Sequence, residues 1–238
     1  ARCISTGLFW IPNPFTPQGQ RYWVWQCLSS YPDKQNKMNI SNPDEDSSWW
    51  EYCTRQGYRK SIMKKLRWTT FGYHHNWDTK VYDEKHKSDY PENLKAFIQA
   101  LARIMFDAFT PEATIINYYH LNSSLGPHND ISELNLNMPL FSLSFGQSAI
   151  FLAGGLSIDE PPIPLLLGSG DILIMSGSSR LIFHAVPRIV PSTEPTWEED
   201  YSSGIGPGEA IPTQEWPHVK DYLQYSRINL NIRQVNIL

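Results

Sequence analysis

Strict alternation in residues 227–233 (RINLNIR) is the feature that most constrains the fold. Polar side chains occupy every odd position, Arg227, Asn229, Asn231 and Arg233, and aliphatic side chains occupy every even one. Because alternate residues of a strand face opposite sides, this segment predicts a strand with one apolar and one strongly polar face. The polar face predicts either a solvated edge strand or the wall of a polar cavity. In a cavity the two guanidinium groups need anionic partners, and Arg binds carboxylates bidentately, so a dicarboxylate ligand would fit.

Short β-type segments dominate the second half of the chain. They are rich in β-branched and aromatic residues, and Gly, Ser and Pro separate them: 113–121, 140–145, 149–152, 171–175 and 180–186. Short strands at this spacing predict a sandwich or jelly roll and not βαβ units. The first 110 residues have a mainly helical or irregular pattern, with a clear amphipathic helix over 91–109. One more helix is predicted over 215–224.

Composition excludes several classes of protein. A chain of 238 residues with 41% apolar side chains can bury a core, which excludes general disorder. No apolar run approaches the roughly 18–20 residues that cross a bilayer. The net charge of −4 is weak evidence against nucleic-acid binding over the whole surface. Cys3, Cys27 and Cys53 fit neither a zinc motif nor a disulfide framework, which predicts a reducing compartment. Because the chain begins at Ala1, we expect that an N-terminal segment was removed.

The triplet His128-Asn129-Asp130 is the first candidate for chemistry. In an extended segment, His128 and Asp130 face the same side and can both reach one metal ion. Alone, the triplet is more typical of a polar surface pair, because 7 His and 24 acidic residues produce such triplets by chance. His184 ends an apolar run, so it is either a third ligand or a hydrogen-bonded core residue. Two His and one carboxylate form the ligand set of non-haem Fe(II) oxygenases.

Two further polar groups have two interpretations each. Asn117 and Tyr119 lie two apart in a predicted strand, so they either form local hydrogen bonds or contact a carboxylate. The segment 48–66 is predicted to be helical and holds the densest positive charge. Its basic residues include Arg55, Arg59, Lys60, Lys64 and Lys65. Their spacing predicts one stripe along a helix, which is either a solvated face or a contact surface for phosphates.

Six motifs occur in a fixed order along the chain. They are Asn117-Tyr118-Tyr119, His128-x-Asp130, 142–147 (SLSFGQ), 170–172 (GDI), 184–188 (HAVPR) and Arg227-x-Asn229-x-x-x-Arg233. In this order they resemble the AlkB family of Fe(II)- and 2-oxoglutarate-dependent dioxygenases. The segments 66–78, 146–152 and 171–177 are similar to the branch of eukaryotic AlkB homologue one. The resemblance covers nearly all of residues 7–238.

The resemblance implies an α+β fold with a double-stranded β-helix (jelly-roll) core over residues 111–238. Before this core it implies a nucleotide-recognition lid region with a supporting helix over 67–110. Residues 1–66 would form an N-terminal helical extension that includes the basic helix. We therefore expect three consecutive parts, with the reaction carried by the last.

The resemblance also assigns roles to individual residues. The implied iron ligands are His128, Asp130 and His184. The implied anchors of 2-oxoglutarate are Arg227 and Arg233, helped by Asn117, Tyr119 and Asn229. The implied substrate contacts are Trp68, Tyr73 and His75, which would hold the base, Glu133 near the substrate, and the five basic residues of 48–66 at the phosphates. The cofactors would be Fe(II) and 2-oxoglutarate, with O₂ as cosubstrate.

The implied reaction is oxidative demethylation, in which an N-methyl carbon is hydroxylated and lost as formaldehyde. A base inside a duplex cannot reach the iron, so it must be flipped or already unpaired. The expected substrates are N6-methyladenine in unpaired or melted DNA and 1-methyladenine in tRNA. The alternatives are an oxygenase of a protein such as a histone, and a non-catalytic jelly-roll binding module. We expect a monomer without a membrane partner, in the nucleus or mitochondrion.

The chain departs from this branch at three positions. His75 stands where the branch has Tyr, Asn231 where it has Thr, and Asn129 where an apolar residue is usual. The middle residue of the iron motif faces away from the metal, so we expect Asn129 to be tolerated. His75 would change how the base is stacked.

Overall fold

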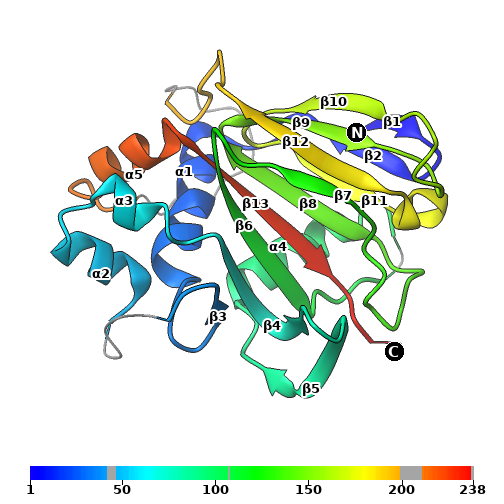
Figure 1. Cartoon of the computed structure of the whole chain (residues 1–238), viewed down its shortest axis with the longest axis horizontal. Coiled ribbons are helices and arrows are strands. Elements are labelled where there is room, and N and C mark those ends of the chain that lie inside the picture. The colour runs from blue at the N-terminus through cyan, green and yellow to red at the C-terminus, as the bar shows by residue number, and fades with distance from the viewer. Residues whose placement is uncertain (42–46, 107, 199–210, 237–238) are drawn as a thin grey trace.

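The computed structural model describes residues 1–41, 47–106, 108–198 and 211–236, and it contains two antiparallel sheets (Figure 1). The larger sheet has the spatial order β1 (Arg2–Ser5), β2 (Leu8–Ile11), β11 (Ile172–Met175), β8 (Leu140–Gly146), β13 (Ser226–Arg233), β6 (Ala113–His120), β4 (Trp68–Asn76) and β3 (Lys37–Met38), and β5 (Val81–Lys87) pairs with β4. The smaller sheet has the order β10 (Ile163–Leu167), β9 (Ser148–Ala153), β12 (His184–Val190) and β7 (Leu125–His128). The predicted jelly-roll core is confirmed.

Helices cover one face of the larger sheet and one end of the molecule. They are α1 (Pro17–Trp25), which continues into a π-helical turn at Gln26–Ser30, α2 (Trp49–Arg55), α3 (Lys60–Met63), α4 (Glu92–Ala102), α5 (Trp216–Leu223) and a 3₁₀ turn at Gly177–Leu181. Figure 1 shows α1 and α4 behind the larger sheet, with α2, α3 and α5 grouped at one side. In α4, Leu94, Ile98 and Ala102 recur every four residues and are buried, as an amphipathic helix requires. No helix among the described residues is long and apolar enough to span a membrane.

Strand β13 lies inside the larger sheet, between β8 and β6. Its aliphatic residues Ile228, Leu230 and Ile232 belong to the main hydrophobic core, which also holds the buried side chains of the helices. Its polar residues face the smaller sheet across a cavity. The interpretation as a solvated edge strand is therefore wrong, and the interpretation as a cavity wall is confirmed.

The N-terminal segment contributes strands as well as helices. Strand β2 pairs with β11 in the larger sheet, with Leu8 opposite Met175 and Ile11 opposite Ile172. The expected N-terminal helical extension therefore also contains two strands, within residues 2–11. The four-residue strands are too short to show a periodicity in sequence, and the pairing with β11 is a long-range contact that local patterns do not reveal.

Strand β4 changes partner along its length, and Gly72 makes this change. Residues up to Gly72 pair with β6, and residues from Tyr73 pair with β5. Gly72 has φ +67°, and a Cβ there would lie 2.0 Å from the backbone oxygen of Glu112, so only glycine fits. The irregularity after Gly72 turns the β4–β5 hairpin away from the sheet and toward the cavity described below.

Candidate metal and 2-oxoglutarate site

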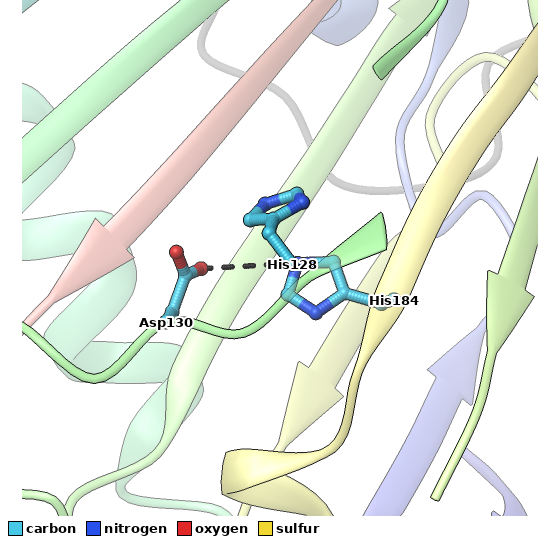
Figure 2. Close-up of side chains that lie close together, drawn as sticks. All are labelled: His128, Asp130 and His184. Atoms are coloured by element: carbon cyan, nitrogen blue, oxygen red, sulfur yellow. Dashed lines mark ion pairs between the residues drawn. The ribbon is translucent and has the colours of Figure 1, made fainter. Parts of the chain in front are cut away.

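His128, Asp130 and His184 lie together between the two sheets, as Figure 2 shows. His128 at the end of β7 is paired in register with His184 at the start of β12, and their ring centroids are 4.3 Å apart. The Asp130 Oδ2 lies 3.9 Å from the Nε2 of His184. One ligating atom from each residue lies within 4.8 Å of the other two, so the three could hold one metal ion. The predicted assembly of these residues is confirmed.

Backbone carbonyls set the orientation of both imidazole rings. The Nδ1 of His128 lies 2.9 Å from the oxygen of Gly126, and the Nδ1 of His184 lies 3.3 Å from the oxygen of Ile182. A carbonyl only accepts, so each Nδ1 must donate its proton. This tautomer leaves both Nε2 lone pairs free, which is the arrangement expected of metal-binding histidines.

Asp130 is ionised by its surroundings despite its burial. Burial raises the pKa of the Asp130 carboxyl, but the Arg233 guanidinium, followed by His184 and His128, outweighs burial and holds this pKa well below its ordinary value. The Arg233 Nη2 donates to the Asp130 Oδ2 at 2.8 Å. Asp130 therefore offers a carboxylate, as a metal ligand must.

Glu133 lines the cavity beside the metal ligands, and both oxygens of its carboxylate pair with arginines. Its Oε1 lies 2.7 Å from the Nε of Arg233, and its Oε2 lies 2.9 Å from the Nη2 of Arg180. Both arginines and Glu133 are buried. The acidic residue that the sequence places near the substrate thus pairs with Arg233 and fixes its position.

Arg180 is a residue of the site that the sequence analysis missed. Besides Glu133, it donates to the backbone oxygens of Asp130 at 2.7 Å and Met138 at 3.1 Å. It therefore ties the loop after His128 to the 3₁₀ turn before His184. The only signal in sequence is an arginine directly before an apolar run, which also occurs at the start of many ordinary strands.

Arg227 is a buried cation without a carboxylate partner among the described residues. Its Nη2 donates to the Ser144 Oγ at 2.7 Å and its Nη1 to the Leu167 oxygen at 3.4 Å, whereas its Nε has no partner. The residue is 2% exposed, and burial lowers its pKa to about 10. An unpaired guanidinium in such a place fits an anionic ligand such as a carboxylate.

One cavity of about 290 Å³ joins these groups. The predicted residues that line it are Asn117, Tyr119, His128, Asp130, His184, Arg227, Asn229 and Arg233. Tyr119 lies opposite Arg227, and Asn117 lies opposite Asn229, on the paired strands β6 and β13. The expected metal and 2-oxoglutarate residues are thus brought together without exception. The arrangement can hold a metal ion at one end and a dicarboxylate along the wall.

The three aromatic residues expected to hold the base do not all lie at a cavity. His75 lines a second cavity beside the metal ligands, but Trp68 and Tyr73 line neither cavity. The Tyr73 hydroxyl instead contacts Glu84 and Asn236. Trp77, which was not assigned a role from sequence, lines both cavities and is 42% exposed.

The basic residues of 48–66 do not form one helical stripe. Helix α2 ends at Arg55, α3 begins at Lys60, and Gly57 and Tyr58 between them have positive φ angles. Both helices lie apart from β7 in Figure 1, and none of the five basic residues lines the two cavities. The prediction of a single helix is wrong because a left-handed turn is not visible in charge spacing.

Comparisons with known proteins agree with this geometry. The family model described as the 2OG-Fe(II) oxygenase superfamily matches residues 7–233. Nucleic acid dioxygenase ALKBH1 of Homo sapiens is 42% identical over 96% of this chain and 64% of its own length. The Mus musculus protein of the same name is 40% identical over the same shares, so this chain spans less than two thirds of both relatives.

Two further similarities extend the set. The tRNA demethylase abh1 of Schizosaccharomyces pombe is 34% identical over 85% of this chain and 70% of its own length. The solved structure of OsALKBH1 has the same fold, with a TM-score of 0.65 and 21% identity over 98% of this chain and 100% of that chain. Because the family model matches almost the whole chain and the metal and anion groups share one cavity, the chain belongs to the 2OG-Fe(II) oxygenase superfamily.

Proposed function

We propose that this chain is an Fe(II)- and 2-oxoglutarate-dependent oxidative demethylase of N-methylated nucleobases that releases formaldehyde. The observation that carries the proposal is one cavity that holds three metal-ligating side chains and the unpartnered guanidinium of Arg227. The names of the relatives support the substrate class. The human and mouse relatives are named nucleic acid dioxygenases, and a relative of Arabidopsis thaliana is named a DNA N(6)-methyladenine demethylase.

His128, Asp130 and His184 would hold the iron, because their ligating atoms converge and their tautomers and charge are already set. Arg233, which lies against Asp130, and Arg227 would bind the two carboxylates of 2-oxoglutarate. Asn117, Tyr119 and Asn229 supply neutral hydrogen-bonding groups in the same wall. When bound, Fe(II) and 2-oxoglutarate supply the oxidation of the N-methyl carbon by O₂.

The chain's own residues would position the base. A methylated base must leave its stack to reach the metal ligands. His75 and Trp77 line the cavity beside His128 and can stack on the base. Trp68 would act through its contact with Trp77, because the two ring centroids are 5.6 Å apart. The five basic residues would bind phosphates at a distance from the metal ligands. We further propose that the protein acts as a monomer in the nucleus or mitochondrion.

The test is formaldehyde release with Fe(II), 2-oxoglutarate and O₂. The substrates are single-stranded, bubbled and paired DNA with N6-methyladenine, and a tRNA with 1-methyladenine. His128→Ala should abolish release, and His86→Ala, which removes an exposed histidine outside the site, should not. Release only from unpaired or bubbled DNA would support base flipping. Turnover of 2-oxoglutarate without formaldehyde from any nucleic acid would overturn the proposal and favour a protein substrate.

A further inference from the structure

Glu112 lies where the wall of the 2-oxoglutarate cavity meets the β4–β5 hairpin. It directly precedes β6, and its backbone N–H donates to the backbone oxygen of Arg233 at 2.9 Å. Its own backbone oxygen accepts from the backbone N–H of Tyr73 at 2.9 Å. Arg233 is the last residue of β13, and Tyr73 is the first residue of β4 that pairs with β5. One residue therefore contacts both the strand of the expected 2-oxoglutarate anchors and the start of the hairpin.

The carboxylate of Glu112 holds the segment 234–236, which follows β13. Its Oε2 accepts from the backbone N–H groups of Val235 at 2.7 Å and Asn236 at 2.8 Å, and its Oε1 lies 3.4 Å from the Nδ2 of Asn236. Glu112 is half-buried and forms no ion pair with any described residue. The carboxylate thus acts as a hydrogen-bond acceptor for main-chain groups and not as a counter-charge.

The segment 234–236 contacts the loop that carries a metal ligand. The backbone oxygen of Val235 accepts from the backbone N–H groups of Leu134 at 3.0 Å and Asn135 at 3.2 Å. Both residues follow Asp130 in the same loop, and Arg233 contacts Asp130 directly at 2.8 Å. The position of the segment 234–236 therefore affects the metal-binding loop through two backbone hydrogen bonds.

The same segment contacts the hairpin. The Nδ2 of Asn236 donates to the hydroxyl of Tyr73 at 2.8 Å. The side chain of Val235 is 1% exposed and packs in a small apolar cluster with Tyr73 and, at its edge, Tyr82 of β5. The residues after β13 thus hold the hairpin by one polar contact and one apolar contact.

We propose that Glu112 is a positioning residue for the reaction. Its carboxylate fixes the segment 234–236, and this segment holds the metal-binding loop, the 2-oxoglutarate strand and the β4–β5 hairpin in one arrangement. A dicarboxylate bound at Arg233 orders the end of β13, and the segment transmits this order to the hairpin through Asn236. The positioning role rests on the 2-oxoglutarate site, and its consequence for a methylated base rests on the proposed function.

Three substitutions at Glu112 separate reach from charge. Glu112→Gln keeps an oxygen at the place of Oε2 and loses the charge, so it should keep the hydrogen bonds to Val235 and Asn236. Glu112→Asp keeps the charge on a shorter side chain, and Glu112→Ala removes both. Because the carboxylate acts as an acceptor, Glu112→Gln should behave like the unmodified protein and Glu112→Asp should not. Glu92→Ala, which removes an exposed carboxylate of α4, is the control.

The experiment is hydrogen exchange with and without saturating 2-oxoglutarate, with Mn(II) in the metal site so that no turnover occurs. In the unmodified protein, the ligand should slow exchange in peptides of 73–87 and 131–135 by about fivefold or more, the lower end of the usual coupling between two sites. Glu112→Ala and Glu112→Asp should lose this slowing, whereas Glu112→Gln and Glu92→Ala should keep it. Peptides of β13 should respond in every variant, because Arg227 and Asn229 remain.

Asn236→Ala keeps the proposal testable if Glu112→Ala does not fold. It removes only the side-chain contact with Tyr73, so it should lose the slowing at 73–87 and keep it at 131–135. A purely structural role of Glu112 predicts a lower Tm in Glu112→Ala with an unchanged response of the hairpin to 2-oxoglutarate. The inference is overturned by that result, by an unchanged hairpin response in Asn236→Ala, or by equal losses in Glu112→Gln and Glu112→Ala.

Turnover distinguishes this inference from the proposed function. KM for a methylated single-stranded oligonucleotide should rise about fivefold in Glu112→Ala and not in Glu112→Gln, because the hairpin is held less firmly. No formaldehyde from any nucleic acid, together with a hairpin response that depends on Glu112, would overturn the proposed function and leave this inference standing. Formaldehyde release together with a hairpin response that is independent of Glu112 would overturn this inference alone.

Discussion

The carboxylate of Glu133 lies 2.7 Å from the Nε of Arg233, and both side chains are buried. Arg233 uses its Nη2 for Asp130 at the same time, and Arg180 holds the other oxygen of Glu133. The four charges form a chain that runs from the metal ligands into the protein interior. Glu133 lies between Arg233 and Arg180 in this chain and therefore positions the arginine that would meet 2-oxoglutarate.

Glu133→Gln should destabilise the protein and weaken 2-oxoglutarate binding. Removing one member of a buried ion pair costs about 3–5 kcal/mol, because the partner charges remain buried. We expect the free energy of unfolding in urea to fall by that amount and KM for 2-oxoglutarate to rise. The control is Glu92→Gln, which breaks an exposed pair with Lys95 at 3.4 Å and should cost under about 1 kcal/mol. Equal stability of the two variants would contradict the structural role of Glu133.

Arg227→Gln should abolish the response to 2-oxoglutarate while the fold is retained. The guanidinium has no carboxylate within ion-pair distance among the described residues, so its loss breaks no buried salt bridge. A ligand at one hundred times its Kd stabilises the folded state by about 2.7 kcal/mol, which thermal denaturation detects as an increase in Tm. Arg227→Gln should lose this increase, whereas Arg188→Gln, at an exposed position of β12, should keep it. An unchanged increase in Arg227→Gln would show that the anion binds elsewhere.

The sequence predicted the site better than it predicted the surroundings of the site. The alternation in 227–233 and the His-x-Asp triplet predict side-chain directions from local strand geometry alone, and the structure shows these directions. The division of β4 at Gly72, the pairing of β2 with β11, and the contact of Arg180 with Glu133 join residues far apart in the chain. Local periodicity contains no information on such contacts. Tyr73 was misplaced for the same reason, because the irregularity after Gly72 decides where its side chain points.

His120 should make the protein less stable below neutral pH. Burial lowers the pKa of His120 to about 4, and its ring contacts the Ser226 Oγ at 2.9 Å and the Lys64 oxygen at 3.3 Å. The folded pKa lies below the unfolded value of about 6.5, so the unfolded state binds the proton first as pH falls. The stabilisation is complete above pH 6.5 and is lost progressively from about pH 6.5 to about pH 4.

The measurement for His120 is urea unfolding between pH 7 and pH 4. A single group changes the free energy of unfolding by at most about 1.4 kcal/mol per pH unit. His120→Gln should reduce the slope in this window relative to the unmodified protein, although it lowers stability at pH 7. His86→Gln is the control, because His86 is exposed and should leave the slope unchanged. A slope that is the same in His120→Gln and the unmodified protein would assign the pH dependence to other groups, such as His74, whose pKa burial also lowers to about 4.

The double variant Lys64→Glu with Lys65→Glu should bind nucleic acid more weakly. Its affinity should also depend less steeply on salt concentration. Both residues follow α3, and the Lys64 Nζ lies 5.1 Å from the centre of the Tyr225 ring, which leaves its charge able to meet a phosphate. Each lost phosphate contact reduces the slope of log K against log salt by about 0.9 for duplex DNA and about 0.7 for single strands. The double variant should therefore lose about 1.4–1.8 from the slope, and its preference between methylated and unmethylated DNA should stay the same.

The matched control for this double variant is Lys34→Glu with Lys95→Glu, which makes the same change of charge at two positions outside 48–66. Electrostatic attraction by the whole protein would make the two double variants equally weak, because both lower the net charge by four. Local contact predicts a clear loss only for the Lys64 and Lys65 variant. Equal salt slopes in the two double variants would remove 48–66 from the proposed phosphate contacts. The cavity with His128, Asp130 and His184 would then be the only nucleic-acid contact that the proposal retains.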